Sequence, residues 1–202
     1  MVHVSRPVKV SSAFIIILLG GYFLARLGMG SGSVSTEFTD ARMQGALIAQ
    51  DIVNLSNDMG AGLEQIHALD ARHNFTEALN VTQGLIEKSK EVRKKAVELS
   101  AQLEQQTSAL SSVSSDDARA AALESISDRL ALITKLINYS DSLADLLSAL
   151  QARFTGAEAG QDSSKVTQLI QEINSEVTAI NHFNRQASQA MDRFDAIIAG
   201  KK

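Results

Sequence analysis

The stretch Glu64-Gln-Ile-His67 has the spacing of a metal-binding motif carried by a helix. In di-iron carboxylate bundles a Glu and a His three residues apart project inward, and a second such pair completes the site. In this sequence the apolar repeat directs Ile66 and Leu69 toward a core, which places Glu64 and His67 on the outer face. The sequence contains no second Glu-x-x-His pair. We therefore expect a solvated pair here and no di-iron site.

Few other residues could support chemistry. His67 and His73 are not spaced to share one helical face, and His182 is expected at an outer position. The chain has no cysteine, which excludes thiolate metal sites, cysteine nucleophiles and disulfides. The sequence contains no nucleotide-binding loop, Ser-His-Asp pattern or haem attachment motif. These observations predict a protein without catalytic activity, cofactor or bound metal.

One basic cluster could bind an acidic partner, and it lies within a run that has the helical repeat. Lys90 and Lys94 fall at outer positions of that repeat, and Glu91 can pair with Lys95 across one helical turn. The pattern is consistent both with a solvated helix face and with a surface that docks an acidic protein. The candidate docking patch consists of Lys88, Lys90, Arg93, Lys94 and Lys95.

Polar residues and glycines interrupt the apolar repeats at a few positions. Asn184 stands in the stripe of the last helical segment, where a buried Asn fixes helix register as it does in coiled coils. Gly60 and Gly62 lie inside the first helical segment, where they indicate close helix approach, a mild kink or a hinge. Further polar positions are expected in the interior at Thr82, Ser89, Gln106 and Ser140.

Four Asn-x-Ser/Thr sequons are expected on outer or loop positions. They would be glycosylated only in a eukaryotic secretory pathway, and in a bacterium they indicate polar surface alone. The four sequons begin at Asn54, Asn74, Asn80 and Asn138.

Apolar residues spaced alternately by three and four predict four long amphipathic helices. The only proline is Pro7, so no proline interrupts a long helix in the rest of the sequence. Asn74 and Glu77 are expected to form a capping box, and the apolar stripe of the third helix is expected to include Leu123 and Leu130. The predicted helices span residues 37–72, 75–111, 116–154 and 163–199.

An apolar run precedes these helices, with Arg6 and Lys9 before it. If Arg26 snorkels, residues 10–29 form a helix about 30 Å long, which matches the hydrocarbon thickness of a bilayer. The alternative is a secretory signal peptide, because small residues near Ser31 satisfy the cleavage rule loosely. In both cases the basic residues keep the N-terminus cytoplasmic and the rest of the chain is translocated.

The sequence therefore predicts an all-α protein with one N-terminal transmembrane (signal-anchor) helix and a long antiparallel up-down-up-down four-helix bundle. The bundle is expected outside the cytoplasm, in the periplasm or at the cell surface, and a dimer of extended hairpins is the structural alternative. The weakly acidic net charge of −4 gives no general attraction to nucleic acid. The expected regions are a basic cytoplasmic N-terminus (1–9), a transmembrane helix (10–29), a linker (30–36) and the bundle (37–199).

We expect this protein to contact the membrane through residues 10–29 and to bind a protein partner or a second copy of itself. A small-molecule ligand is not favoured. The expected role is that of a scaffold, a spacer or an accessory subunit of a membrane or envelope complex. If the N-terminal segment is cleaved, the same bundle would be secreted.

A sensory or ligand-binding module is the alternative function. The layout resembles the extracytoplasmic four-helix sensor domains of bacterial chemoreceptors in its membrane helix and number of helices, although no sequence motif is shared. The resemblance implies a module that senses a ligand outside the cytoplasm. Because no second membrane helix or signalling region follows the bundle in this sequence, such a module would need a signalling partner.

Overall fold

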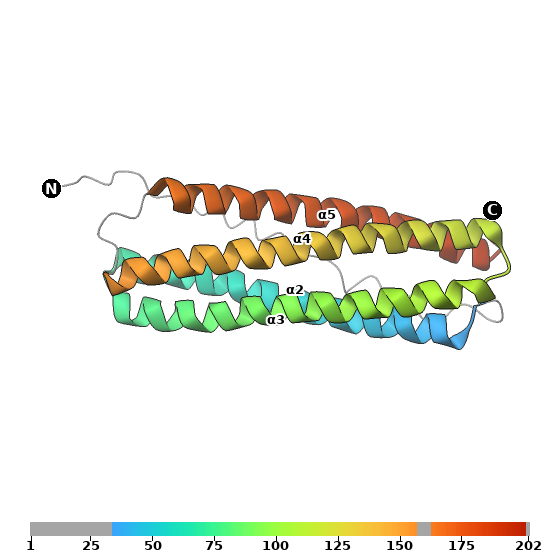
Figure 1. The fold of residues 1–202 in the computed structure, drawn as a ribbon, viewed down its shortest axis with the longest axis horizontal. Helices are drawn as coiled ribbons and strands as arrows, with labels where there is room; N and C mark the ends of the chain where they lie inside the picture. Colours follow the sequence, from blue (N-terminus) through green and yellow to red (C-terminus); the bar gives the residue numbers. More distant parts are fainter. Residues whose placement is uncertain (1–33, 157–162, 201–202) are drawn as a thin grey trace.

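A computed structural model describes residues 34–156 and 163–200, which are helical apart from short turns. Four long helices lie side by side along the long axis of the molecule (Figure 1). This confirms the all-helical bundle, and each helix begins and ends within two residues of the predicted bounds. The elements are α2 (Thr36–Ala71), α3 (Phe75–Ala109), a short 3-10 helix η1 (Leu110–Ser112), α4 (Asp116–Thr155) and α5 (Ser163–Ile198).

None of the helices in the described part of the chain is long and apolar enough to cross a membrane. The predicted basic N-terminus, the predicted transmembrane helix at residues 10–29 and the first residues of the predicted linker lie outside the described residues.

Side chains cap the N-termini of two helices. Ser35 Oγ accepts a hydrogen bond from the backbone N–H of Phe38 at 3.3 Å, and Ser115 Oγ accepts one from Ala118 at 3.2 Å. The capping box predicted for α3 does not form. The side chain of Asn74 accepts no backbone hydrogen bond and instead donates to the Glu77 carboxylate at 2.8 Å.

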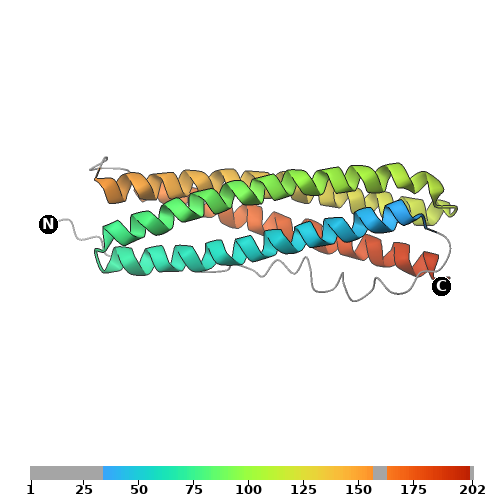
Figure 2. The same ribbon diagram turned by 90° about the horizontal axis from the view of Figure 1, so that it is seen from below.

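Helices that follow one another in the chain run antiparallel and pack along their lengths. α2 and α5 are different, because they do not pack along their lengths and meet mainly at one end of the bundle. Figure 2 shows this end, where the start of α2 and the end of α5 lie together. The turn between α2 and α3 and the end of α4 lie at the opposite end.

The apolar stripe of α4 differs from the predicted one. Leu123 and Leu130 are 49% and 46% exposed, so their assignment to the core was wrong. The core face of α4 is wide because α4 packs against both α3 and α5, and small side chains fill much of its first half. That half of α4 buries Ala118, Ala121, Ala122, Ser125, Ile126, Leu132 and Ile133.

Candidate functional site

The start of α2 and the end of α5 meet through a pair of buried rings. Phe38 and Phe194 are almost fully buried, and their ring centroids lie 5.3 Å apart. Aromatic pairs at this separation add packing energy beyond the area that they bury. We call this junction the shared end of the bundle.

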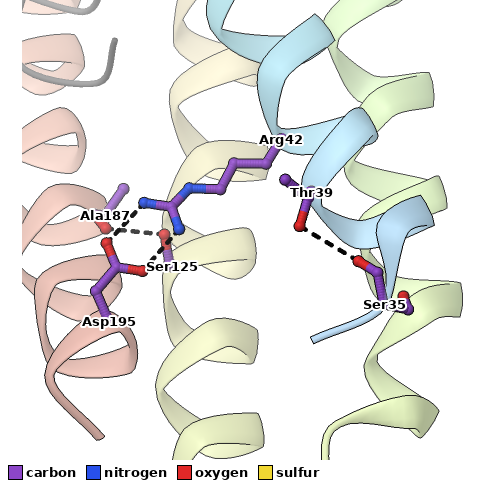
Figure 3. Close-up of polar contacts among 6 residues, drawn as sticks. All are labelled: Ser35, Thr39, Arg42, Ser125, Ala187 and Asp195. Atoms are coloured by element: carbon purple, nitrogen blue, oxygen red, sulfur yellow. Dashed lines mark hydrogen bonds and ion pairs between the residues drawn. The ribbon is translucent and has the colours of Figure 1, made fainter. Parts of the chain in front are cut away.

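An ion pair stands next to these rings. The Arg42 guanidinium donates two parallel hydrogen bonds to the Asp195 carboxylate, at 2.7 and 2.8 Å (Figure 3). Burial and the neighbouring Arg42 lower the pKa of Arg129 to about 10, while Asp195 opposes that shift. Asp195 thus faces two cations, and the bidentate geometry makes its bond to Arg42 a strong one.

Each pair of successive helices is also joined by a buried polar side chain that donates to a backbone carbonyl. Gln106 Nε2 donates to the carbonyl of Ala41 at 3.4 Å and links α3 to α2. Ser140 Oγ donates to the carbonyl of Ser89 at 2.5 Å and links α4 to α3. Ser125 Oγ donates to the carbonyl of Ala187 at 2.8 Å and links α4 to α5 (Figure 3). These bonds show how the bundle uses its buried hydroxyl and amide groups.

Ser56 departs from this pattern. Its side chain is 5% exposed, yet its hydroxyl has no hydrogen-bond partner. Ser56 belongs to a line of buried small or short side chains on α2, spaced by three and four residues. We call this line the small-residue stripe, and it consists of Ala46, Ala49, Val53, Ser56 and Gly60.

The small-residue stripe points toward α5. Arg42 lies one helical turn before Ala46 on the same side of α2, and it reaches Asp195 of α5. By the same helical repeat, the side of α5 that carries Asp195 presents Val177, Asn181, Asn184 and Ser188. The two sides define a seam between α2 and α5.

Two asparagines line the α5 side of this seam. Asn181 Nδ2 is buried and has no hydrogen-bond partner. Asn184 is half-buried, where the sequence predicted a buried residue, and its role in fixing register stays a prediction. The seam thus holds two buried polar groups, on Ser56 and Asn181, without a hydrogen-bond partner; outside the seam the Tyr139 hydroxyl and Gln106 Oε1 are also buried without one.

The opposite edge of α2 packs closely against α3. A Cβ atom added at Gly62 would lie 2.6 Å from Leu85 Cδ2, which is closer than real Cβ contacts. Close helix approach therefore explains Gly62, while α2 continues without a break through both Gly60 and Gly62. The hinge proposed at these glycines stays a prediction.

The basic cluster on α3 is paired with carboxylates. Lys88 and Lys95 reach Asp58 and Asp51 of α2 at 2.6 and 2.9 Å, and Arg93 reaches Asp141 of α4 at 2.5 Å. These pairs link α3 to both neighbouring helices.

Lys90 and Lys94 of the same cluster pair within α3, with Glu87 and Glu98. The hydrogen bond that Lys95 donates to the Asp51 carboxylate is the largest cause that raises the pKa of Lys95. Neighbouring carboxylates therefore balance the charge of the candidate docking patch, whose role as a docking surface stays a prediction.

A second group of charges lies between α4 and α5. Burial raises the pKa of Asp128, the nearby Glu124 adds to that shift, and His182 and Arg193 oppose it. Arg193 is paired with Glu124 at 2.5 Å. These residues are exposed or half-buried and form a polar edge of the α4–α5 interface.

The remaining candidates lie on the surface. Glu64, His67 and His73 are exposed, as is each of the four sequon asparagines, Asn54, Asn74, Asn80 and Asn138. Within residues 34–156 and 163–200, no group of three or more His, Asp or Glu side chains is arranged to hold a metal ion.

Sequence reasoning missed several of the most informative residues of the bundle. Ser56 and Ser125 are small polar residues beside apolar stripes, and periodicity alone does not show whether they are buried. Arg42 could not be recognised from the sequence as part of an ion pair, because its partner Asp195 lies 153 residues away in the chain. The sequence feature that could have indicated the seam is the series of small or short residues at positions 46, 49, 53, 56 and 60. Their spacing by three and four residues places them on one face of a helix.

Comparisons with protein-family models, curated proteins and solved structures found no match to this chain.

Proposed function

We propose that this protein is a membrane-tethered helical rod that works through protein–protein contacts, as a scaffold, a spacer or an accessory subunit of a membrane complex. In this proposal residues 10–29 form the tether and the bundle lies outside the cytoplasm. The observation that carries the proposal is the shared end, where the Arg42–Asp195 pair joins the start of α2 to the end of α5.

The shared end supports a tether because the N-terminal segment connects to α2 there. A bundle attached at that point stands with its other end away from the bilayer. Helices of 35 to 40 residues are about 53–60 Å long, which sets the height of the rod. The turn between α2 and α3, with exposed Arg72 and His73, is then the part presented to a partner.

Photo-crosslinking in native membranes tests this orientation. A photoreactive residue is placed at Thr36, exposed at the shared end, or at Arg72, exposed at the opposite end. We expect lipid adducts from position 36 and none from position 72, which instead forms adducts with protein. A third probe at exposed Lys90, midway along α3, serves as the matched control for random collisions.

Two results would count against the proposal. Lipid adducts that are absent at position 36 or equal at all three positions would exclude a tether at the shared end. Protein adducts at position 72 no more frequent than at position 90 would exclude a specific contact made by the far end of the rod.

A further inference from the structure

The small-residue stripe on α2 is a surface suited to close approach by another helix. Small side chains allow two helix backbones to come near each other, as Gly62 does for α3 on the other edge of α2. The stripe is buried, but neither α4 nor α5 packs along α2, and α3 occupies the opposite edge. The described helices therefore provide no close neighbour for this stripe.

The unpartnered hydroxyl of Ser56 points to the same conclusion. Ser125 and Ser140 each donate to a backbone carbonyl of the neighbouring helix. Ser56 is also buried and lies within the stripe, yet its hydroxyl has no acceptor. A buried hydroxyl without a partner is costly, so an acceptor on a helix in the seam would complete the pattern.

We infer that the seam between α2 and α5 is a docking site for this chain's own apolar segment, residues 10–29, which lies there as a helix antiparallel to α2. The Ser56 hydroxyl then donates to a backbone carbonyl of that segment. The Asn181 amide donates to another.

The position and length of the segment favour it over other occupants. It connects to α2 at the shared end, where the Arg42–Asp195 pair closes the seam, and the Gly-Ser-Gly-Ser run at residues 30–33 allows the chain to turn back. As a helix it is about 30 Å long, and the stripe from Ala46 to Gly60 is about 21 Å long. The segment therefore covers the whole stripe.

The chemistry of the segment also fits. Residues 10–25 carry no charge, so this part of the segment can enter a buried seam without an unpaired ion, and Arg26 is the one charged residue of the segment. Gly21 and Ala25 give the segment a small face of its own, on which the stripe can pack closely.

This inference goes beyond the proposed function, because it gives residues 10–29 a binding site in the bundle in addition to their position in the bilayer. In the docked state the segment is withdrawn from the membrane and fills the seam. In the tethered state it leaves the seam and spans the bilayer. The seam and the bilayer therefore compete for the same helix.

Disulfide mapping in the full chain tests the inference cleanly, because the natural sequence has no cysteine. One cysteine is fixed by Ser56→Cys, and a second is moved one position at a time through residues 10–18. A disulfide needs Cβ atoms within about 4.5 Å of each other. In lipid-free buffer we expect an intramolecular disulfide at one or two positions a helical turn apart. The matched control, Ala61→Cys on the exposed face of α2, should give none.

Four results would overturn the inference: no intramolecular disulfide with Ser56→Cys at any scanned position, equal yields from Ala61→Cys, disulfides only between two chains, or a chain that aggregates in lipid-free buffer without cross-linking. The wild-type chain provides a second measurement. Backbone amides of residues 13–25 should exchange slowly in lipid-free buffer, and fast exchange would contradict docking.

The same scan in vesicles of phosphatidylcholine and phosphatidylglycerol separates this inference from the proposed function. Vesicle binding with loss of the disulfide supports both. Vesicle binding with no disulfide under either condition overturns docking and leaves the tether. A disulfide that persists without vesicle binding overturns the tether and leaves docking.

Discussion

The two edges of α2 contact their surroundings in different ways. On the α3 edge, Gly62 allows Leu85 to approach closely, and Asp51 and Asp58 form ion pairs with α3. On the α5 edge, the small-residue stripe is buried, but α5 is joined to α2 mainly at the shared end. Both edges carry side chains suited to a close helix, and only one edge has such a helix among the described residues.

This difference shows that small residues on a helix are explained by a close neighbour on one edge of α2 and by none of the described helices on the other. At Gly62 the neighbour is Leu85, so the glycine is explained. At Ser56 the hydroxyl has no partner, and no described helix packs along the small-residue stripe.

The largest expected effect comes from disturbing the α3 edge. Gly62→Leu should destabilise the protein by about 3 kcal/mol, because the new side chain must displace the buried Leu85. The measurement is urea unfolding followed by circular dichroism. Gly84→Leu on α3 is the matched control. No atom lies near its Cβ position, so higher helix propensity should stabilise the protein by about 0.5–1 kcal/mol. Equal effects of the two variants would contradict close packing at Gly62.

The next effect concerns the shared end. Asp195→Ala should cost about 2 kcal/mol, because it removes the two parallel hydrogen bonds that the half-buried Arg42 donates to this carboxylate. Asp141→Ala removes the exposed partner of Arg93 and should cost less than about 1 kcal/mol. Thermal unfolding of both variants checks the ranking. A reversed order would mean that the shared end is not held by this pair.

A smaller effect compares buried serines. Ser125→Ala should cost about 1 kcal/mol, because it removes a hydrogen bond to the Ala187 carbonyl. If residues 10–29 dock in the seam, Ser56→Ala in the full chain should cost a similar amount. An increase in stability on Ser56→Ala would show that the hydroxyl has no acceptor, and would contradict docking. Chemical unfolding of the two variants in lipid-free buffer makes the comparison.

The smallest effect concerns the ion pairs on the α3 edge. The double variant Asp51→Asn/Asp58→Asn should lose no more than about 1 kcal/mol, because both carboxylates are exposed and their partners Lys95 and Lys88 are half-buried or exposed. Unfolding in low salt and in 1 M salt should show this loss shrinking as the Debye length falls to about 3 Å. A loss as large as that of Asp195→Ala, or one independent of salt, would give these pairs a larger structural role.

Helix bounds could be predicted from local sequence because local chemistry sets them. Ser35 and Ser115 cap helices through hydrogen bonds to residues three positions away, and Gly156 ends α4 in a left-handed conformation. The core positions Ile66 and Leu69 of α2 were also predictable from the apolar repeat, and both are buried.

Contacts between helices could not be predicted, because they depend on how helices are placed beside one another. Leu123 and Leu130 follow the apolar repeat but lie on the exposed face of α4. For the basic cluster the sequence left open a solvated helix face or a docking patch, and it did not indicate the partners Asp51, Asp58 and Asp141, which lie on other helices. The seam could not be predicted either, because it depends on how α2 and α5 are placed relative to each other.

Both proposals require residues 10–29 to be present in the mature protein, and the mass of the intact protein tests this most directly. The protein is extracted from the membrane and soluble fractions of its native cells, and each form is weighed by mass spectrometry. We predict a membrane-fraction species close to the 21.7 kDa of the whole chain, resistant to extraction by alkaline carbonate. A soluble species that begins near Ser31 would contradict both the tether and the docked segment, and would leave a secreted bundle.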